Sequence, residues 1–259
     1  MMREILGYMD VAQIAIWLFW LFFAGLVIYL RREDRREGYP LEADTHPGKM
    51  LAPSLIFYPS PKTFRLADGT SVKAPSGQRD SRPVAAQPTA KFPGAPLAPT
   101  GANPMLDSVG PGSWAERADT PEMTYDNHLK IVPVRVATGY SCSAKEDPRG
   151  YDVIGADMKV AGKVVDLWVD RSEALIRYFE VALPSGRSVL LPVTFSDITR
   201  GARPGIGRIK VEALLASQFA DVPATRQPDS VTRLEEERIC AYYGAGTLYA
   251  TPDRAEPLL

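Results

Sequence analysis

Residues 11–30 read VAQIAIWLFWLFFAGLVIYL, a run without any charged side chain in which Gln13 is the only strongly polar residue. As an α-helix rising about 1.5 Å per residue, this run would span ~30 Å, the thickness of a bilayer's hydrocarbon core. A buried core helix would show a polar stripe, and a signal peptide would show a basic start, a shorter apolar run and a small-residue cleavage site. Arg3 is offset by Glu4 and Asp10, and arginines follow the run directly. We therefore predict a single retained transmembrane helix.

The charges beside this run predict its orientation. Arg3 is the only basic residue before it, whereas four arginines follow it closely, at positions 31, 32, 35 and 36. Basic residues mark the cytoplasmic side of a membrane helix, and acidic residues count for little in this rule. We therefore predict that residues 1–10 lie on the non-cytoplasmic side and that everything after the helix is cytoplasmic.

The segment RREDRRE at residues 31–37 is expected to continue the helix beyond the membrane surface. Gly38 and Pro40 then end it, because glycine suits a helix C-cap and proline cannot continue a helix. This end can be read simply as a solvated terminus, or as a contact with the headgroups of anionic lipids. We predict headgroup contacts for Tyr29, Arg31, Arg32 and Arg35.

Composition limits the classes of function that the chain can have. With 259 residues and a net charge of -1, it can form one moderate domain plus irregular sequence, or two small domains. The near-zero charge argues against nucleic-acid binding, which needs a basic face. Cys142 and Cys240 are expected to be free thiols in a cytoplasmic domain. The only two histidines, His46 and His128, argue against a His-ligated haem, chlorophyll or zinc site, so no metal site is predicted.

Residues 38–128 form a proline-rich segment with more than half of the chain's 23 prolines. One hairpin is predicted in it, with strands at 63–66 and 70–73 around the turn residues Asp68 and Gly69. Composition alone would make the remainder a disordered linker. A free linker has little use for large apolar side chains, yet the segment keeps several, such as Phe92 and Trp114. We expect an extended segment that lies along another protein's surface, with true disorder as the alternative.

From residue 129 onward, short apolar runs alternate with turns, which is the pattern of a small antiparallel barrel or sandwich. The predicted strands lie at residues 131–136, 160–170, 176–183, 188–194 and 208–211, and a short helix is predicted at 213–219. Thr232 and Glu235 form the sequence pattern of a capping box, which begins a last helix. We expect that helix to run to about Tyr243 and to end at Gly244 and Gly246.

Several blocks of this sequence resemble one known family over nearly the whole chain and in the same order. They are RREDRREGYPL after a lone membrane span, PKTF at 61–64, APTGANPM at 98–105, VGPGSWAERAD at 109–119, GKVVDLWVD at 162–170 and EEERICAYYGAGTLYATPDRA at 235–255. These blocks resemble the H subunit of the purple-bacterial photosynthetic reaction centre. The block GKVVDLWVDRSEALIRYFEV, followed by VLLPV, also resembles a PRC-barrel domain. The fold class expected is therefore a single N-terminal transmembrane helix plus a cytoplasmic, mainly-β PRC-type barrel with a C-terminal helix, at residues 129–259.

The resemblance implies a place and partners for the chain. Residues 1–10 would be a short periplasmic tail, residues 11–37 the membrane helix with its extension, and the membrane an intracytoplasmic (chromatophore) one. The implied partners are the L and M subunits, membrane lipids and the surrounding light-harvesting antenna ring. Bacteriochlorophyll, bacteriopheophytin, quinones and a non-haem iron would be held by the partner subunits, and none by this chain. The implied roles are assembly, shielding of the acceptor quinones from water and conduction of protons to the secondary quinone.

The resemblance also singles out residues for a proton relay. His128, Asp126 and Glu122 would take up protons at the surface, although the family commonly has two histidines where this chain has Asp126 and His128. Residues closer to the quinone would be Glu173, Arg177, Asp170 and Asp166. For His128 the alternative is an exposed loop histidine, and for the two aspartates it is turn chemistry of the barrel. Glu173 and Arg177 are spaced i,i+4, but the local pattern is strand–turn–strand, so the sequence does not show that they meet.

Two rival functions remain open at the level of sequence. One is a membrane-anchored PRC-barrel adaptor that binds another cytoplasmic protein, which pigment absorbance of the purified complex would distinguish. The other is a membrane-tethered enzyme, which the absence of a nucleophile with a base argues against. The glycine-rich GARPGIG at residues 201–207 lacks the Lys-Ser/Thr of a phosphate-binding loop. We therefore predict a non-enzymatic, proton-conducting subunit of a photochemical complex.

The arginine-based orientation predicts which face of the membrane a protease can attack. In inside-out vesicles, added protease should digest everything after residue 37, because that part faces the medium. In right-side-out vesicles, only the short N-terminal tail should be cut, as followed by immunoblotting with an epitope tag at either end. The reverse pattern would contradict the orientation.

Overall fold

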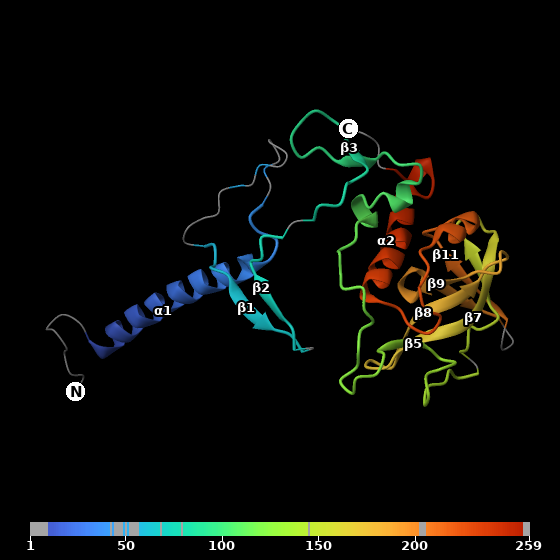
Figure 1. Cartoon of the computed structure of the whole chain (residues 1–259), viewed down its shortest axis with the longest axis horizontal. Coiled ribbons are helices and arrows are strands. Elements are labelled where there is room, and N and C mark those ends of the chain that lie inside the picture. Colours follow the sequence, from blue (N-terminus) through green and yellow to red (C-terminus); the bar gives the residue numbers. More distant parts are fainter. Residues whose placement is uncertain are drawn as a thin grey trace. The chain divides into compact units, whose positions relative to one another are not determined.

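The computed structural model describes residues 10–255, except 42, 44–48, 50, 52–56, 68, 79, 145 and 202–205. The expectations for the N-terminal tail, His46 and Asp68 therefore lie outside the described residues. Two compact units are formed, Met1–Ser81 with Phe92–Gly94, and Arg82–Lys91 with Ala95–Leu259, and each is considered by itself (Figure 1).

The first unit begins with helix α1 (Val11–Glu33). The carboxylate of Asp10 caps it by accepting a hydrogen bond from the backbone N–H of Gln13, over 2.7 Å. No residue of α1 is buried within the chain, although nearly all its side chains are apolar. The described residues contain one helix long and apolar enough to cross a bilayer, and α1 is that helix. The structure thus agrees with the predicted membrane helix.

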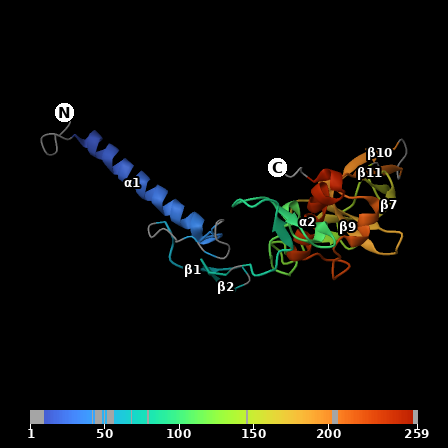
Figure 2. The ribbon, with the colours of Figure 1, turned by 90° about the horizontal axis from the view of Figure 1, so that it is seen from above.

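A short 3-10 helix, η1 (Asp34–Arg36), continues α1, and Gly38 then takes a positive φ of 74°, as expected where a helix ends. Strands β1 (Lys62–Arg65) and β2 (Ser71–Ala74) pair antiparallel, which confirms the predicted hairpin (Figure 2). Arg36 joins the helix end to this hairpin. Its guanidinium donates two hydrogen bonds of 2.7 Å to Glu33 and bonds of 3.0 Å to the carbonyls of Ser60 and Ala74.

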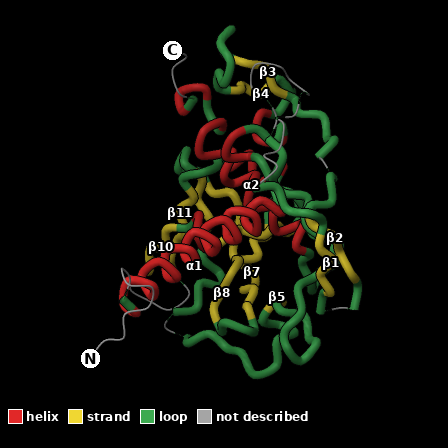
Figure 3. Tube along the Cα trace, turned by 90° about the vertical axis from the view of Figure 1, so that its left-hand side faces the viewer, coloured by secondary structure: helices red, strands yellow, loops and turns green. Residues whose placement is uncertain are grey.

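The second unit holds a small pair, β3 (Ala86–Pro88) with β4 (Leu97–Pro99), seen in Figure 3, and a seven-stranded sheet. The strand order of the large sheet is β10-β11-β6-β7-β8-β9, and β5 pairs with β7 beside this path. Its strands are β5 (Ile131–Pro133), β6 (Asp152–Gly155), β7 (Val160–Asp170), β8 (Leu175–Ala182), β9 (Ser188–Pro192), β10 (Asp197–Arg200) and β11 (Gly207–Val211). These pairs are antiparallel except for β11 with β6, which is parallel. Among the described residues, no pairing closes the sheet into a barrel.

The mainly-β fold with a C-terminal helix is confirmed, with local differences from the expected boundaries. β7 has the predicted bounds, whereas β5 ends at Pro133, because a turn with a hydrogen bond from the N–H of Ala137 to the carbonyl of Pro133 follows it. β6 and β10 were not predicted. The predicted helix at 213–219 is a 3-10 helix, η5 (Ala216–Asp221). Further 3-10 turns are η2 (Pro104–Leu106), η3 (Gly110–Gly112), η4 (Val193–Phe195) and η6 (Pro252–Arg254).

The sheet buries its apolar side chains against helix α2 (Arg233–Tyr249), drawn in red beside the strands in Figure 1. The largest fully buried side chains include Trp168, Phe179 and Tyr243. The predicted capping box is confirmed: Thr232 Oγ1 accepts from the N–H of Glu235, and the Glu235 carboxylate accepts from the N–H of Thr232.

The predicted end of α2 was wrong, because the helix runs through both glycines to Tyr249. A Cβ on Gly244 would lie 2.6 Å from the carbonyl oxygen of Pro111 in η3, and a Cβ on Gly246 would collide with the carbonyl oxygen of Ala213. The two glycines therefore allow other backbone segments to approach the helix, instead of ending it.

We expect Gly244→Ala to lower the free energy of unfolding by roughly 1–3 kcal/mol, because the added methyl group must displace η3. On an open helix face, a change from glycine to alanine would instead raise the free energy of unfolding, by up to about 1 kcal/mol. Urea unfolding of the full chain in detergent, followed by tryptophan fluorescence, measures the difference. Thr247→Ala, on the exposed side of the same turn, is the control and should stay within about 0.5 kcal/mol of the unchanged chain. A stabilised Gly244→Ala chain would contradict the close contact.

Candidate functional site

Asp170, the last residue of β7, is fully buried and lies at the centre of a charged cluster. Its Oδ1 accepts hydrogen bonds from the backbone N–H groups of Ser172, at 2.9 Å, and Glu173, at 3.2 Å. Its Oδ2 lies 3.7 Å from both Lys130 Nζ and Arg177 Nε, and accepts no hydrogen bond from the described residues. A buried carboxylate is tolerated only when charges or donors compensate it, and here two cations do so.

Strand pairing brings these groups together. β5 pairs with the end of β7, so that Ile131 lies opposite Asp170 and Lys130 comes directly beside it. Arg177 lies on β8, whose register on β7 shifts near this point. Lys130 also forms an ion pair of 3.3 Å with Glu122. Burial lowers the pKa of Lys130, but its hydrogen bond to Glu122 and the negative charges of Asp170, Glu122 and Glu173 outweigh burial and raise the pKa overall. Lys130 therefore stays charged at neutral pH.

Glu173 borders this cluster without an ion pair to Arg177. Its backbone N–H holds Asp170, its side chain is exposed, and its charge acts on Lys130. Residues 171–174 form a turn in which Ala174 has a positive φ of 54°. The i,i+4 spacing would bring two side chains together only on a helix, so Arg177 instead pairs with Asp170.

His128 and Asp126 lie in an exposed turn at the tip of a small hairpin. The turn is closed by a hydrogen bond of 2.8 Å from the N–H of Thr124 to the carbonyl of His128, and by a bond of 3.1 Å from the N–H of His128 to Thr124 Oγ1. At the base of the hairpin, the N–H of Lys130 donates to the carbonyl of Glu122. The structure thus brings Glu122 to Asp170 and leaves His128 and Asp126 in water.

Asp166 belongs to a second cluster, centred on Arg135. The guanidinium of Arg135 lies 3.0 Å from Asp166, 2.6 Å from Glu180 and 2.9 Å from Asp229. The indole N–H of Trp168 also donates to Glu180, over 3.1 Å. These bonds fix the turn after β5 and the segment before α2 to the sheet. The structure therefore separates Asp166 from Asp170.

Sequence reasoning missed two ionisable residues, Lys130 beside Asp170 and Glu236 beside Tyr178. Lys130 is a single lysine before a short strand, and Glu236 is one of three consecutive glutamates, which no motif distinguishes. Their positions follow only from the pairing of β5 with β7 and from the packing of α2 against the sheet. Among the described residues, no group of His, Cys, Asp and Glu could hold a metal ion, and Cys142 and Cys240 are free.

The residues predicted to contact lipid headgroups lie at the end of α1. Tyr29 and Arg32 are exposed, and Arg31 forms an exposed ion pair of 3.4 Å with Asp34. Arg35 stacks instead over the rings of Tyr39 and Phe57, at 5.4 and 5.3 Å from their centroids. These positions leave Tyr29, Arg31 and Arg32 free to meet a membrane surface, whereas Arg35 is partly engaged within the chain.

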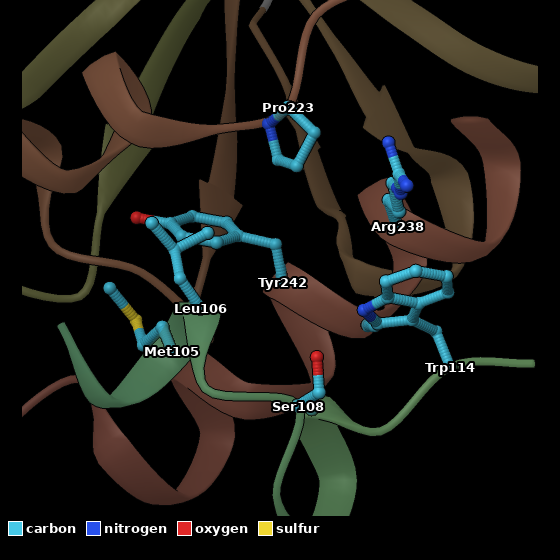
Figure 4. Close-up of a pocket in the computed structure, with 9 residues that line it drawn as sticks. Met105, Leu106, Ser108, Trp114, Pro223, Arg238 and Tyr242 are labelled. Atoms are coloured by element: carbon cyan, nitrogen blue, oxygen red, sulfur yellow. The ribbon is translucent and has the colours of Figure 1, made fainter. Parts of the chain in front are cut away.

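A cavity of about 210 Å³ lies between α2 and the segment 105–114 (Figure 4). Trp114 at its edge stacks against two guanidinium groups, those of Arg82 at 3.8 Å and Arg238 at 4.6 Å from the ring centroid. The other side chains that line the cavity are mostly apolar, and none of the residues predicted for the proton relay lines the cavity. The cavity is therefore separate from the cluster of ionisable groups.

We expect Asp170→Asn to lower the free energy of unfolding by roughly 2–4 kcal/mol, because it leaves Lys130 and Arg177 without their shared counter-charge. The asparagine oxygen can still accept the two backbone hydrogen bonds, so the change isolates the charge. Asp126→Asn, a loss of the same charge at an exposed site, should cost less than about 0.5 kcal/mol. Denaturant unfolding of the full chain in detergent compares the two. Equal effects would show that the ion pairs of Asp170 contribute nothing.

Two family models match the chain. The model of the photosynthetic reaction centre H-chain N-terminal region matches residues 3–136, and the PRC-barrel domain matches residues 144–213. The first match includes α1, the proline-rich segment and β5, and the second includes β6 to β11. Because the H-chain match covers just over half of the 259 residues, the protein belongs to the family of photosynthetic reaction-centre H chains, and its sheet is a PRC-barrel domain.

Proposed function

We propose that this chain caps the cytoplasmic face of the reaction-centre L and M subunits, supports their assembly, shields the acceptor quinones from water and conducts protons to the secondary quinone. As a member of the H-chain family, the protein is a structural subunit of a reaction centre, associates with L and M, and itself binds no pigment. Its one apolar helix fits a location in the membrane. The finer roles rest on the arrangement of its ionisable groups.

The single observation that carries the proton role is the fully buried Asp170, linked through Lys130 to the partly exposed Glu122. A doubly reduced quinone must take up two protons within a site closed to water, so protons need a series of titratable groups between them. His128 and Asp126 at the exposed hairpin tip would exchange protons with water. Glu122, Asp170 and Glu173 would pass them inward, while Lys130 and Arg177 hold the carboxylates in place.

The topology follows the arginine distribution. We propose that residues 1–10 are periplasmic, that residues 11–37 cross the inner (chromatophore) membrane, and that residues 129–259 form the cytoplasmic domain. Residues 38–128 would lie along the surface of L and M, in addition to the contacts that η2 and η3 of this segment make with α2. The antenna ring and lipids would surround α1. Bacteriochlorophyll, bacteriopheophytin, quinones and the iron would remain on the partner subunits.

Glu173→Gln tests the proton role, because it keeps the side chain's shape and removes its titrating group. In the complex purified through this chain and identified by its near-infrared pigment absorbance, the first electron transfer to the secondary quinone should change little. The second, which is coupled to proton uptake, should slow about tenfold for each 1.4 kcal/mol added to its barrier. Flash spectroscopy between about pH 6 and 9, around the ordinary pKa of histidine, measures both.

The matched control is Glu116→Gln, which removes an exposed glutamate outside the cluster. It should leave both electron transfers unchanged. A second electron transfer at the unaltered rate in Glu173→Gln over the whole range would remove Glu173 from the relay.

A further inference from the structure

Tyr178 and Glu236 form a hydrogen-bonded pair that the relay above does not use. Tyr178 on β8 is 4% exposed, and its hydroxyl donates to Glu236 Oε2 on α2 over 2.7 Å. Glu236 is half-buried. The pair thus joins the sheet to α2 through a carboxyl group that is largely withdrawn from water.

This pair is continuous with the Asp170 cluster. Arg177 precedes Tyr178 on β8, and its guanidinium lies 3.7 Å from Asp170 while its charge also acts on Glu236. Glu122, the ion-pair partner of Lys130, acts on Glu236 as well. One arginine, Arg177, therefore acts on both Asp170 and Glu236.

The groups around Glu236 shift its pKa in opposite directions. Burial raises the pKa of Glu236, as does the charge of Glu122, whereas the hydrogen bond from Tyr178 and the charges of Arg177 and Arg117 lower it; burial prevails, so the pKa is raised overall. Burial also raises the pKa of Tyr178, so its hydroxyl keeps its proton. Cys240 lies beside Tyr178, and Glu237 pairs with Arg117 at 3.2 Å.

We propose that Glu236 is a second proton-binding site of the Asp170 cluster, which holds a proton from water and releases it when the acceptor quinone is reduced. Each cycle moves one proton and no electron through the site: uptake from water turns the Glu236 carboxylate into a carboxylic acid, and transfer of that proton to the reduced quinone restores the carboxylate. Tyr178 donates its hydrogen bond in both states. The proposal rests on the proposed proton role of the chain. It adds a site on α2.

Infrared difference spectroscopy of the purified complex in the dark, titrated with pH, tests the site without quinone chemistry. A carboxylic C=O band should appear as the pH falls, and should be missing in Glu236→Gln. Tyr178→Phe and Arg177→Met should each move its midpoint to higher pH, because each removes a group that favours the carboxylate. Glu237→Gln, which changes the neighbouring half-buried glutamate that pairs with Arg117, is the control and should leave the band in place.

The pH dependence of the chain's stability tests the Glu236 site independently. A folded-state pKa above the unfolded one means that the folded chain binds more protons between the two values, so stability falls as pH rises through that window. Glu236→Gln should remove this fall, and Glu237→Gln should keep it. Unfolding of the full chain in detergent at a series of pH values measures both.

The last measurement is the rate of flash-induced proton uptake that accompanies reduction of the secondary quinone, which should be lower near neutral pH in Glu236→Gln because one proton donor is lost. A missing infrared band in the unchanged complex would overturn the site, whatever the relay does. A normal band with unaltered uptake would overturn the release of its proton to the quinone. The Glu173→Gln result decides the relay separately, so the two failures are distinguishable.

Discussion

The burial of β7 is the constraint on which the second unit depends. This strand of 11 residues pairs with β5 and β6 along one edge and with β8 along the other. Its backbone groups are thereby satisfied, which the continuously buried end of the strand at residues 166–170 requires because it lies away from water. The same pairing places Trp168 in the core and fixes where the strand's two buried carboxylates must lie.

Those two carboxylates are stabilised in different ways. Asp166 lies against the guanidinium of Arg135 and accepts hydrogen bonds from it and from the backbone of Leu167. Asp170 accepts two backbone hydrogen bonds through Oδ1, whereas its Oδ2 accepts none from the described residues and lies 3.7 Å from two cations. Asp166 is thus held by a close ion pair, whereas one oxygen of Asp170 lacks a direct hydrogen bond. This contrast is why the proton role is assigned to Asp170 and its neighbours.

Local signals in the sequence predicted the elements that local physics decides. The membrane helix followed from its length and lack of charge, β7 from its β-branched run, and the start of α2 from Thr232 and Glu235. Contacts between distant segments could not be read in this way. Gly244 looked like a helix end because the approach of Pro111 is invisible in sequence, and the parallel pairing of β11 with β6 has no local signature.

The candidate site shows the same division. The sequence left open whether Glu173 meets Arg177, and the structure shows that Arg177, after the turn between β7 and β8, pairs with Asp170 instead. Asp170 was singled out by the resemblance to the H-subunit family, whereas Lys130 and Glu236 needed the register of β5 and the docking of α2. The residue types therefore indicated the kind of chemistry, but which side chains pair with one another follows only from the strand pairing of the sheet.

The contact of η3 with α2 also has a consequence for how the chain is made. α1 leaves the ribosome before α2, which follows about 200 residues later, so the membrane helix is available for insertion while the sheet still lacks α2. At a synthesis rate of about 5–20 residues per second, that interval lasts roughly 10–40 s. During this interval Pro111 lacks its contact, because Gly244 lies more than a hundred positions later in the chain. The core of the nascent chain thus stays unfinished until α2 has emerged, and the fold can be completed only after that.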